Sequence, residues 1–155
     1  MESIKDRLIG RMKQYFSDDK KRIQHALRVT EYAERIFQYE KNADRDVVLA
    51  AAILHDIGIH EAERKYGSSQ GKYQEIEGPP IARKIMFEEE LPDKLVDEVC
   101  QIIAHHHTPG VLNADNFKVV YDADLIVNLE DRELKKGRFL TEGGSKIASE
   151  GQLTK

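Results

Sequence analysis

The sequence predicts an all-α protein, and three observations carry the prediction. Apolar residues recur along most of the chain at the three- and four-residue spacing of an amphipathic helix. No stretch alternates apolar and polar residues in the manner of a half-buried strand. The 4 Pro and 10 Gly gather between the periodic segments, where such residues end helices. We therefore expect a helical bundle of about six helices.

In the first half of the chain, three helices are predicted. The first covers residues 2–16 and the second residues 20–39, and the Ser-Asp-Asp sequence between them can cap the second. The third begins after Asp44, continues through Val47–Leu54 and ends at Gly58. Because Val47–Leu54 is apolar on every side, we expect this helix to be the central, buried one.

In the second half, prolines and polar residues set the boundaries. Residues 64–74 are predicted to form a polar, flexible loop, and Pro79-Pro80 to begin a fourth helix that ends near Glu90. The rest of the prediction is a fifth helix after Leu91-Pro92-Asp93 that reaches His107, a sixth helix over residues 115–134, and a tail of uncertain order over residues 135–155.

The composition is that of one domain with a mildly acidic surface. The 155 residues suit a single domain over residues 1–155, with 40% hydrophobic residues for a core and 34% charged residues for a solvated exterior. The 24 Lys and Arg against 28 Asp and Glu give a net charge of −4. That balance argues against nucleic-acid wrapping and against binding to an anionic membrane, because both need a basic surface.

The cysteine count and the hydropathy pattern predict a cytoplasmic protein. The single Cys100 excludes an internal disulfide and suits a reducing compartment. The N-terminal residues lack the apolar run of a signal peptide. The longest apolar run, Val47–Leu54, is far shorter than the roughly 20 residues that span a bilayer.

His55 and Asp56 are the first candidates for a functional site. They directly follow the apolar run Val47–Leu54, where a charged pair is costly to bury unless a partner or a metal compensates it. The alternative is a histidine at a helix C-terminus that interacts with the helix dipole.

Asp122 is the second candidate, because it lies within an apolar stripe of the sixth predicted helix. Val119, Ile126 and Leu129 form the stripe at helical spacing. An Asp on a core face needs a cation, an Arg or several hydrogen bonds, so a metal ligand and a structural ion pair are both open. Asp124 lies on a more polar side of the helix, and we expect it to be at least partly solvated.

Histidines on two other predicted helices are directed toward the same interior. His25 flanks the apolar stripe of the second helix. Helical phase places His106, and secondly His107, on the buried face of the fifth helix, and His105 on the wetter side. A core-edge histidine and a solvated cluster are the alternatives. Ligands projecting from facing helices are how bundles hold metals, and this mixture of imidazole and carboxylate suits Fe or Mn, with Zn also compatible.

Four residues in this order resemble the H…HD…D signature of the HD superfamily of metal-dependent phosphohydrolases: His25, His55, Asp56 and Asp122. Their local contexts are similar as well, in the runs HALRV (25–29), AAILHDIG (51–58) and YDADLIVNL (121–129). The resemblance extends over about residues 20–132, the core of the predicted domain, and implies an all-α bundle. It also implies that these four residues ligate a first metal.

The resemblance leaves one or two metals open. Relatives with two metals add histidines between the HD pair and the last Asp. Here Glu77 stands where those relatives usually carry His, and His106 and His107 lie in a stretch similar to the His-Thr-x-Gly of the symmetrical diadenosine-tetraphosphate hydrolase branch. Glu77 can ligate a hard ion, or it can merely complement the N-terminus of the fourth helix.

The implied substrate is a nucleotide or another small phosphate ester. The chain lacks the extended Gly-Tyr-Pro element of the cyclic-dinucleotide branch, which disfavours that substrate class. Ile59 replaces the Lys that commonly follows HD-x-Gly in relatives. Arg28 and Lys84 are therefore the candidates for contacting substrate phosphate, with a solvated role as the alternative for each.

The resemblance thus predicts a phosphomonoesterase or phosphodiesterase that uses a metal-activated water. Asp56 would ligate the metal and bridge two metals where both are present. His106, where it is not a ligand, would hold substrate or shuttle a proton. The alternatives are a dinuclear-iron oxygenase of the same superfamily and a non-catalytic metal- or nucleotide-binding regulatory module.

Overall fold

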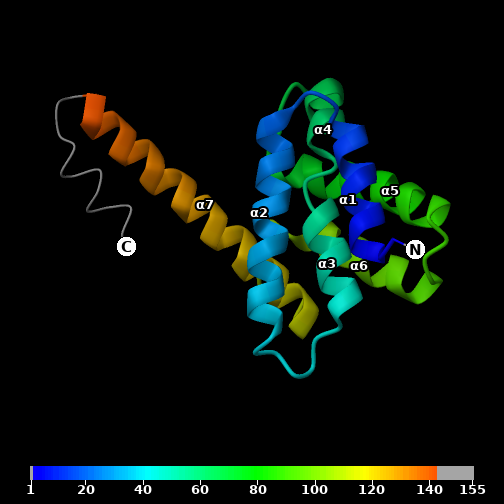
Figure 1. Cartoon of the computed structure of the whole chain (residues 1–155). Helices are drawn as coiled ribbons and strands as arrows, with labels where there is room; N and C mark the ends of the chain where they lie inside the picture. The colour runs from blue at the N-terminus through cyan, green and yellow to red at the C-terminus, as the bar shows by residue number, and fades with distance from the viewer. Residues whose placement is uncertain (1, 143–155) are drawn as a thin grey trace. The chain divides into compact units, whose positions relative to one another are not determined.

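The computed structural model in Figure 1 describes residues 2–142, which form α-helices and no strand. The helices are Ile4–Phe16 (α1), Lys20–Phe37 (α2), Arg45–Leu54 (α3), Ile59–Tyr66 (α4), Gly71–Glu88 (α5), Asp93–His105 (α6) and Asp115–Glu142 (α7). The prediction of an all-α fold is confirmed. No helix within the described residues has the length and apolarity needed to cross a membrane.

The chain divides into two compact units, residues 1–123 and residues 124–155. The first contains α1 to α6 and the start of α7, and the described part of the second is the remainder of α7. The single domain over residues 1–155 stays a prediction. In the predicted tail, residues 135–142 belong to α7, and residues 143–155 lie outside the described part of the chain.

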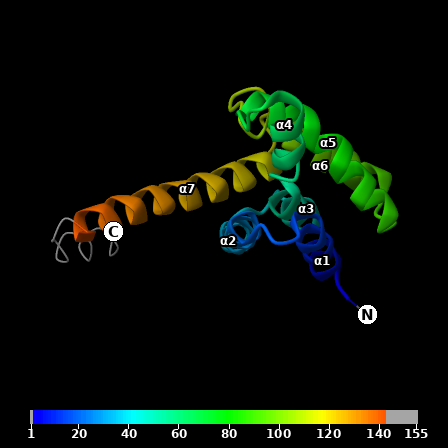
Figure 2. The same cartoon turned by 90° about the horizontal axis from the view of Figure 1, so that it is seen from above.

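α3 is the central helix of the first unit. Every residue of Val47–Leu54 is buried, and α3 contacts α1, α2 and α6, as Figure 2 shows from above for α1 and α2. Burying a Val, Leu or Ile side chain stabilises a fold by about 1.5–3 kcal/mol. The helix that is apolar on every side is therefore the one that its neighbours surround, as predicted.

Side-chain caps fix where the first helices begin. The Asp19 carboxylate accepts a hydrogen bond from the Arg22 backbone N–H at 3.3 Å. Asp44 accepts from the backbone of Asp46 at 3.0 Å and of Val47 at 3.4 Å. These bonds satisfy N–H groups that the first turn of a helix cannot pair internally. The predicted caps at Asp19 and Asp44 are confirmed.

The predicted loop over residues 64–74 is wrong for most of its length. α4 runs to Tyr66 and ends at Gly67, whose φ of 65° is a left-handed conformation that glycine adopts without strain. α5 then begins at Gly71 and carries Pro79 and Pro80 in its interior, not at its start. An interior Pro removes a backbone hydrogen bond. Here the contacts of α5 with α4 and α6 outweigh that cost.

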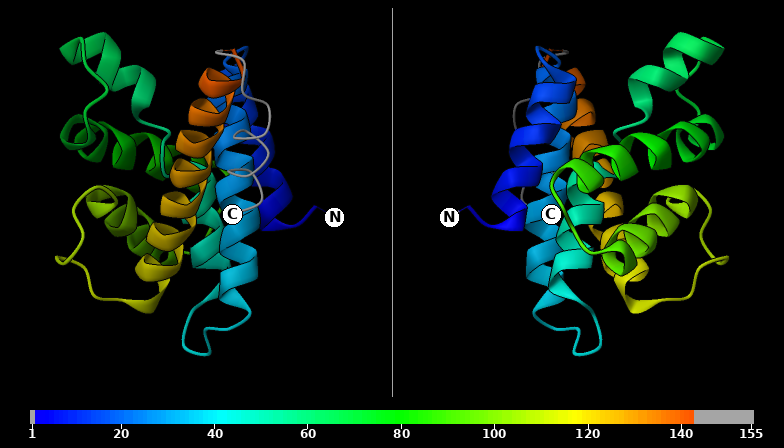
Figure 3. Two further views of the ribbon diagram at one scale, coloured as in Figure 1. Left: turned by 90° about the vertical axis from the view of Figure 1, so that its left-hand side faces the viewer. Right: turned by 90° about the vertical axis from the view of Figure 1, so that its right-hand side faces the viewer.

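Two glycines allow α5 to cross closely over the turn that follows α3. A Cβ on Gly58 would lie 2.5 Å from the backbone N of Gly78, and a Cβ on Gly78 would lie 2.8 Å from Ile103 Cγ2 in α6. Figure 3 shows α5 and α6, in green and yellow-green, from two sides. Because any side chain at Gly58 would collide with backbone, this contact fixes α5 next to His55 and Asp56.

We predict that Gly58→Ala lowers the free energy of unfolding by about 1–3 kcal/mol, because the added methyl group overpacks a backbone-to-backbone contact. The matched control is Gly10→Ala in α1, where a Cβ would meet nothing within 4 Å and the gain in helix propensity should stabilise by about 0.5–1 kcal/mol. Urea unfolding of the metal-free proteins measures both. Equal stability of Gly58→Ala and wild type would contradict the close crossing.

Candidate metal centre

Three helices bring the central residues of the site together. His55 follows the last residue of α3, with Asp56 next to it, and the two are 1% and 7% exposed. His25 lies half-buried on α2. His106 follows the last residue of α6 and is 3% exposed. The predicted burial of His106 is confirmed, whereas the prediction that His107 also lies on the buried face is wrong, because α6 ends at His105 and His107 is exposed.

The side chains of these four residues converge on one point. The Nε2 atoms of His25 and His55 are 3.3 Å apart, and each lies 3.4 Å from Asp56 Oδ2. His106 Nε2 lies 3.5 Å from the other carboxylate oxygen, Oδ1. His25, His55 and Asp56 thus form a set whose ligand atoms all lie within 4.8 Å of one another.

Backbone hydrogen bonds determine which ring nitrogens face this point. Nδ1 of His55 lies 2.7 Å from the carbonyl oxygen of Ala52, and Nδ1 of His106 lies 2.7 Å from that of Ile103. A carbonyl oxygen only accepts, so Nδ1 carries the proton and donates. In the neutral rings, Nε2 of His55 and of His106 is then an acceptor directed at the Asp56 carboxylate.

This arrangement leaves a buried acceptor unsatisfied. Among the described residues, His106 Nε2 has no hydrogen-bond partner although it is buried. A buried polar atom without a partner is costly, and facing acceptors cannot pair with one another. A cation between the nitrogen and carboxylate atoms would satisfy them together, so the donor set fits a divalent metal.

The Asp56 carboxyl group is held in its charged form. Burial raises its pKa, but when the neighbouring His55 and His106 rings also carry a proton on Nε2, their positive charge and hydrogen bonds outweigh burial, so the pKa of Asp56 lies well below its usual value. A cation bound in the place of those protons would act on the carboxyl group in the same direction. Asp56 is therefore an anion at neutral pH and is able to bind a cation.

A second set of ligand atoms shares Asp56. Asp56, His106 and His107 also place one ligand atom each within 4.8 Å of the others. The ring centroids of His106 and His107 are 4.0 Å apart, and His107 is exposed whereas His106 is not. Since Oδ2 of Asp56 is near His25 and His55 while Oδ1 is near His106, the carboxylate faces both sets.

The prediction that Asp122 lies on the buried face of its helix is wrong. Asp122 is exposed, and within the described residues it belongs to neither ligand set. Among residues 115–136 of α7, the buried ones are Phe117, Val119, Val120, Ala123 and Val127. The predicted stripe includes Leu129, which is 45% exposed. The predicted buried face of α7 therefore differs from the observed one by about one residue around the helix. Asp124, between Val120 and Val127 on the edge of the buried face, is half-buried.

Glu77 accepts hydrogen bonds from two side chains of α4 and belongs to neither ligand set of the described residues. It is 7% exposed, and its carboxylate accepts from Lys65 Nζ at 3.0 Å and from the Tyr66 hydroxyl at 2.8 Å. Both hydrogen bonds lower the pKa of Glu77, and the bond from Tyr66 has the larger effect. The alternative of a charge at the start of a helix is wrong, because Glu77 lies in the interior of α5.

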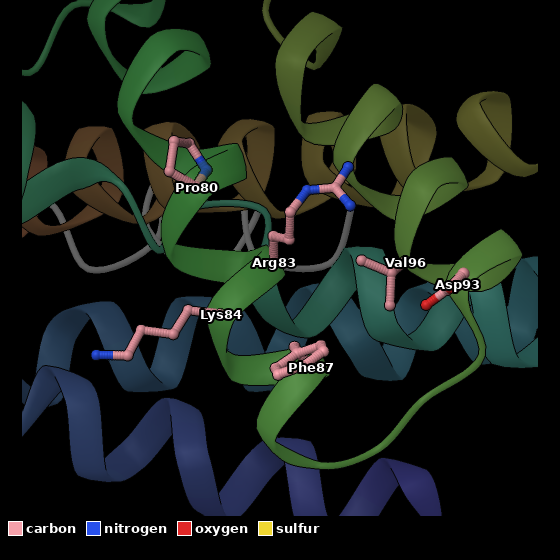
Figure 4. A pocket seen from close by; sticks show the side chains of 6 residues that line it. All are labelled: Pro80, Arg83, Lys84, Phe87, Asp93 and Val96. Carbon is pink, nitrogen blue, oxygen red and sulfur yellow. The ribbon is translucent and has the colours of Figure 1, made fainter.

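The two basic residues predicted to contact phosphate have different surroundings. Arg28 is half-buried on α2, one turn after His25. Lys84 lies ten residues beyond Gln74 on α5, about 15 Å along the helix axis. Figure 4 shows Lys84 beside Arg83 in a surface groove with Pro80, Phe87, Asp93 and Val96. Arg28 is the better placed of the two.

Gln74 is a residue that the sequence analysis missed. It is 6% exposed and contacts His107, with Oε1 of the amide 3.1 Å from Nε2 of the ring. Gln74 lies within the predicted loop over residues 64–74, and a loop prediction does not say whether a side chain faces the interior or solvent. The spacing of Gly71, Gln74, Gly78 and Ala82 (i, i+3, i+7, i+11) is the signal that could have placed it on the inward face of a helix.

Comparisons with known proteins give one match. The profile of the HD domain family matches residues 22–136, which include each of the residues that converge on the site. Searches of curated proteins and of solved structures find no match.

We predict that Glu77→Gln keeps the metal content of the wild type and lowers the free energy of unfolding by about 1–2 kcal/mol, since charge-assisted hydrogen bonds to Lys65 and Tyr66 are lost. Because the folded pKa of Glu77 lies below its unfolded value of about 4.3, this contribution is present above that pH and is lost as the pH falls. Unfolding measured from neutral pH down to about pH 3 should show the two proteins converging. A lost metal equivalent would instead place Glu77 among the ligands.

Proposed function

Because the chain belongs to the HD domain family, we propose that it is a metal-dependent phosphohydrolase that acts on a nucleotide or another small phosphate ester. The family implies a metal-dependent hydrolase, and the His and Asp clusters of the described residues are able to bind a divalent metal. The phosphate-ester substrate follows from the resemblance of the ordered motifs to phosphohydrolases. The proposed metal is Fe, Mn or Zn, with Asp56 shared between two ions.

One observation carries the proposal: acceptor atoms of three buried residues, His55, Asp56 and His106, converge. His55 and His106 each donate from Nδ1 to a backbone carbonyl and present Nε2 toward Asp56. An inward-facing carboxylate without a cation would repel these lone pairs. A structural hydrogen-bond network would require donors at the same positions.

The roles of the residues follow from their positions. A divalent cation bound here would polarise a phosphoryl oxygen and lower the pKa of a bound water toward neutrality. His25, His55 and Asp56 would hold the first cation, and Asp56 with His106 and His107 the second. Asp56 faces both sets and would balance part of the positive charge of each. Arg28, on the same side of α2 as His25, would contact the substrate phosphate.

The proposal is tested by metal analysis together with a screen of phosphomonoesters, phosphodiesters and nucleotides in the presence of Mn²⁺. We expect the wild type to bind metal and to hydrolyse at least one class. His106→Ala should lower kcat/KM more than about 100-fold, because even the partners of metal ligands are typically worth 10–100-fold. His105→Ala, which removes the adjacent half-buried ring, is the matched control and should keep both metal and activity.

Three outcomes would overturn the proposal in different ways. Absence of bound metal after expression in supplemented medium would exclude the metal site. Bound metal and tight nucleotide binding without product would support the regulatory module, and oxygen-dependent turnover with bound iron would support the oxygenase.

A further inference from the structure

His107 is held by three residues at the start of α5. Its ring lies over Gly71, where a Cβ would come within 2.6 Å of His107 Cγ. Gln74 Oε1 contacts the ring nitrogen Nε2 at 3.1 Å. The Glu75 carboxylate accepts from the His107 backbone N–H at 2.9 Å and from the Thr108 hydroxyl. These contacts thus fix the position of an exposed histidine beyond the end of a helix.

The contact with Gln74 determines which ring nitrogen of His107 is protonated. Gln74 Nε2 donates to the Ser69 carbonyl oxygen at 2.6 Å, which fixes the orientation of the amide because a carbonyl oxygen only accepts. The amide oxygen of Gln74 therefore faces His107 and can only accept. His107 Nε2 must then carry the proton, and Nδ1 is the acceptor nitrogen of the neutral ring.

This tautomer is the opposite of the one at the other two histidines. His55 and His106 are protonated on Nδ1 by their backbone contacts and present Nε2. His107 is protonated on Nε2 and presents Nδ1 as its only acceptor. A ring with its proton on the nitrogen facing Asp56 would hydrogen-bond to the carboxylate and exclude a cation, so the choice of tautomer matters for the second ligand set.

We propose that Gln74 is a positioning residue, which with Gly71 holds His107 so that Nδ1 completes a cation-binding position with Asp56 and His106. The proposal rests on the proposed metal-dependent function for its purpose, but not for its geometry. Histidine ligands of metals typically donate their second ring N–H to a carboxylate, carbonyl or water, which fixes both tautomer and orientation. The Gln74 amide oxygen performs that task here, and Ser69 fixes Gln74 in turn.

The first experiment measures the tautomer without metal or substrate. Long-range ¹H–¹⁵N correlation spectra of the uniformly labelled full chain, recorded above the ordinary imidazole pKa of about 6.5, distinguish protonated from unprotonated ring nitrogens. We expect the proton on Nε2 of His107 and on Nδ1 of His55 and His106. In Gln74→Met, His107 should populate both tautomers. A proton on Nδ1 of His107 in the wild type, or an unchanged spectrum in Gln74→Met, overturns the proposal.

The second experiment measures the effect on the cation itself by calorimetric titration with Mn²⁺ alone. We expect two equivalents in the wild type. In Gln74→Met and in Gly71→Ala, the second should bind 10–100-fold more weakly and the first should be unchanged. Gly71 does not have a positive φ, so the added methyl group displaces the His107 ring without straining the backbone.

Matched controls separate positioning from general damage. Gln101→Met changes an exposed residue of α6, Gly10→Ala fills open space in α1, and both should bind Mn²⁺ as the wild type does. Far-UV circular dichroism verifies that each variant is folded. Two unaltered equivalents in Gln74→Met, or a single equivalent in the wild type, contradicts the role in cation binding. No bound Mn²⁺ in the wild type refutes the metal-dependent function, while the tautomer experiment still decides the role of Gln74.

Discussion

Hydrogen-bond acceptors facing one another inside a helical bundle are the constraint on which the site depends. The Ala52 and Ile103 carbonyls take the Nδ1 protons of His55 and His106, and both rings then direct lone pairs at the Asp56 carboxylate. Each of these contacts is made at the end of a helix, where the carbonyls of the last turn lack the usual intrahelical partner four residues on. The ends of α3 and α6 thus supply the hydrogen bonds that fix ligand tautomers. A cation at the centre is the simplest species that stabilises such an arrangement.

A backbone contact between Gly58 and Gly78 determines which residues of α5 lie near the site. Gly58 and Gly78 bring α5 against the turn that carries His55 and Asp56. Gly71, Gln74 and Gly78 share one face of α5, because they are spaced i, i+3 and i+7. The crossing that Gly78 permits therefore also places Gly71 and Gln74 toward the end of α6, where His107 lies. One close approach thus couples the fold to the orientation of a ring two helical turns away.

The sequence predicted the parts of the molecule that depend on strong local patterns. Val47–Leu54 is apolar on every side, so its central position and the buried His55-Asp56 pair could be predicted, as could the inward phase of His106. Asp122 could not be placed correctly, because α7 carries exposed leucines, among them Leu129, that imitate a core stripe. The start of α5 was missed because Pro79-Pro80 is a strong local signal for a helix start, whereas the tertiary contacts of Gly71 and Gly78 that override it act between helices. The partners of Glu77 lie on α4, which residue spacing alone did not reveal.

The two ligand sets differ in burial, so the site has an enclosed side and a side that faces solvent. His55 and Asp56 are 1% and 7% exposed and the His25 side chain is 12% exposed, so a cation held by the first set would be largely enclosed by protein. His107, a member of the second set, is exposed, so the second set opens to solvent. Metal sites that do chemistry keep a coordination position for water or substrate, whereas structural sites are closed. The enclosed position is therefore suited to a structural cation, and under the proposed function the open position beside His107 is where water and the substrate would reach a cation. Gln74 contacts His107 from a buried position, so the proposed positioning contact would fix an exposed ring from the protein side.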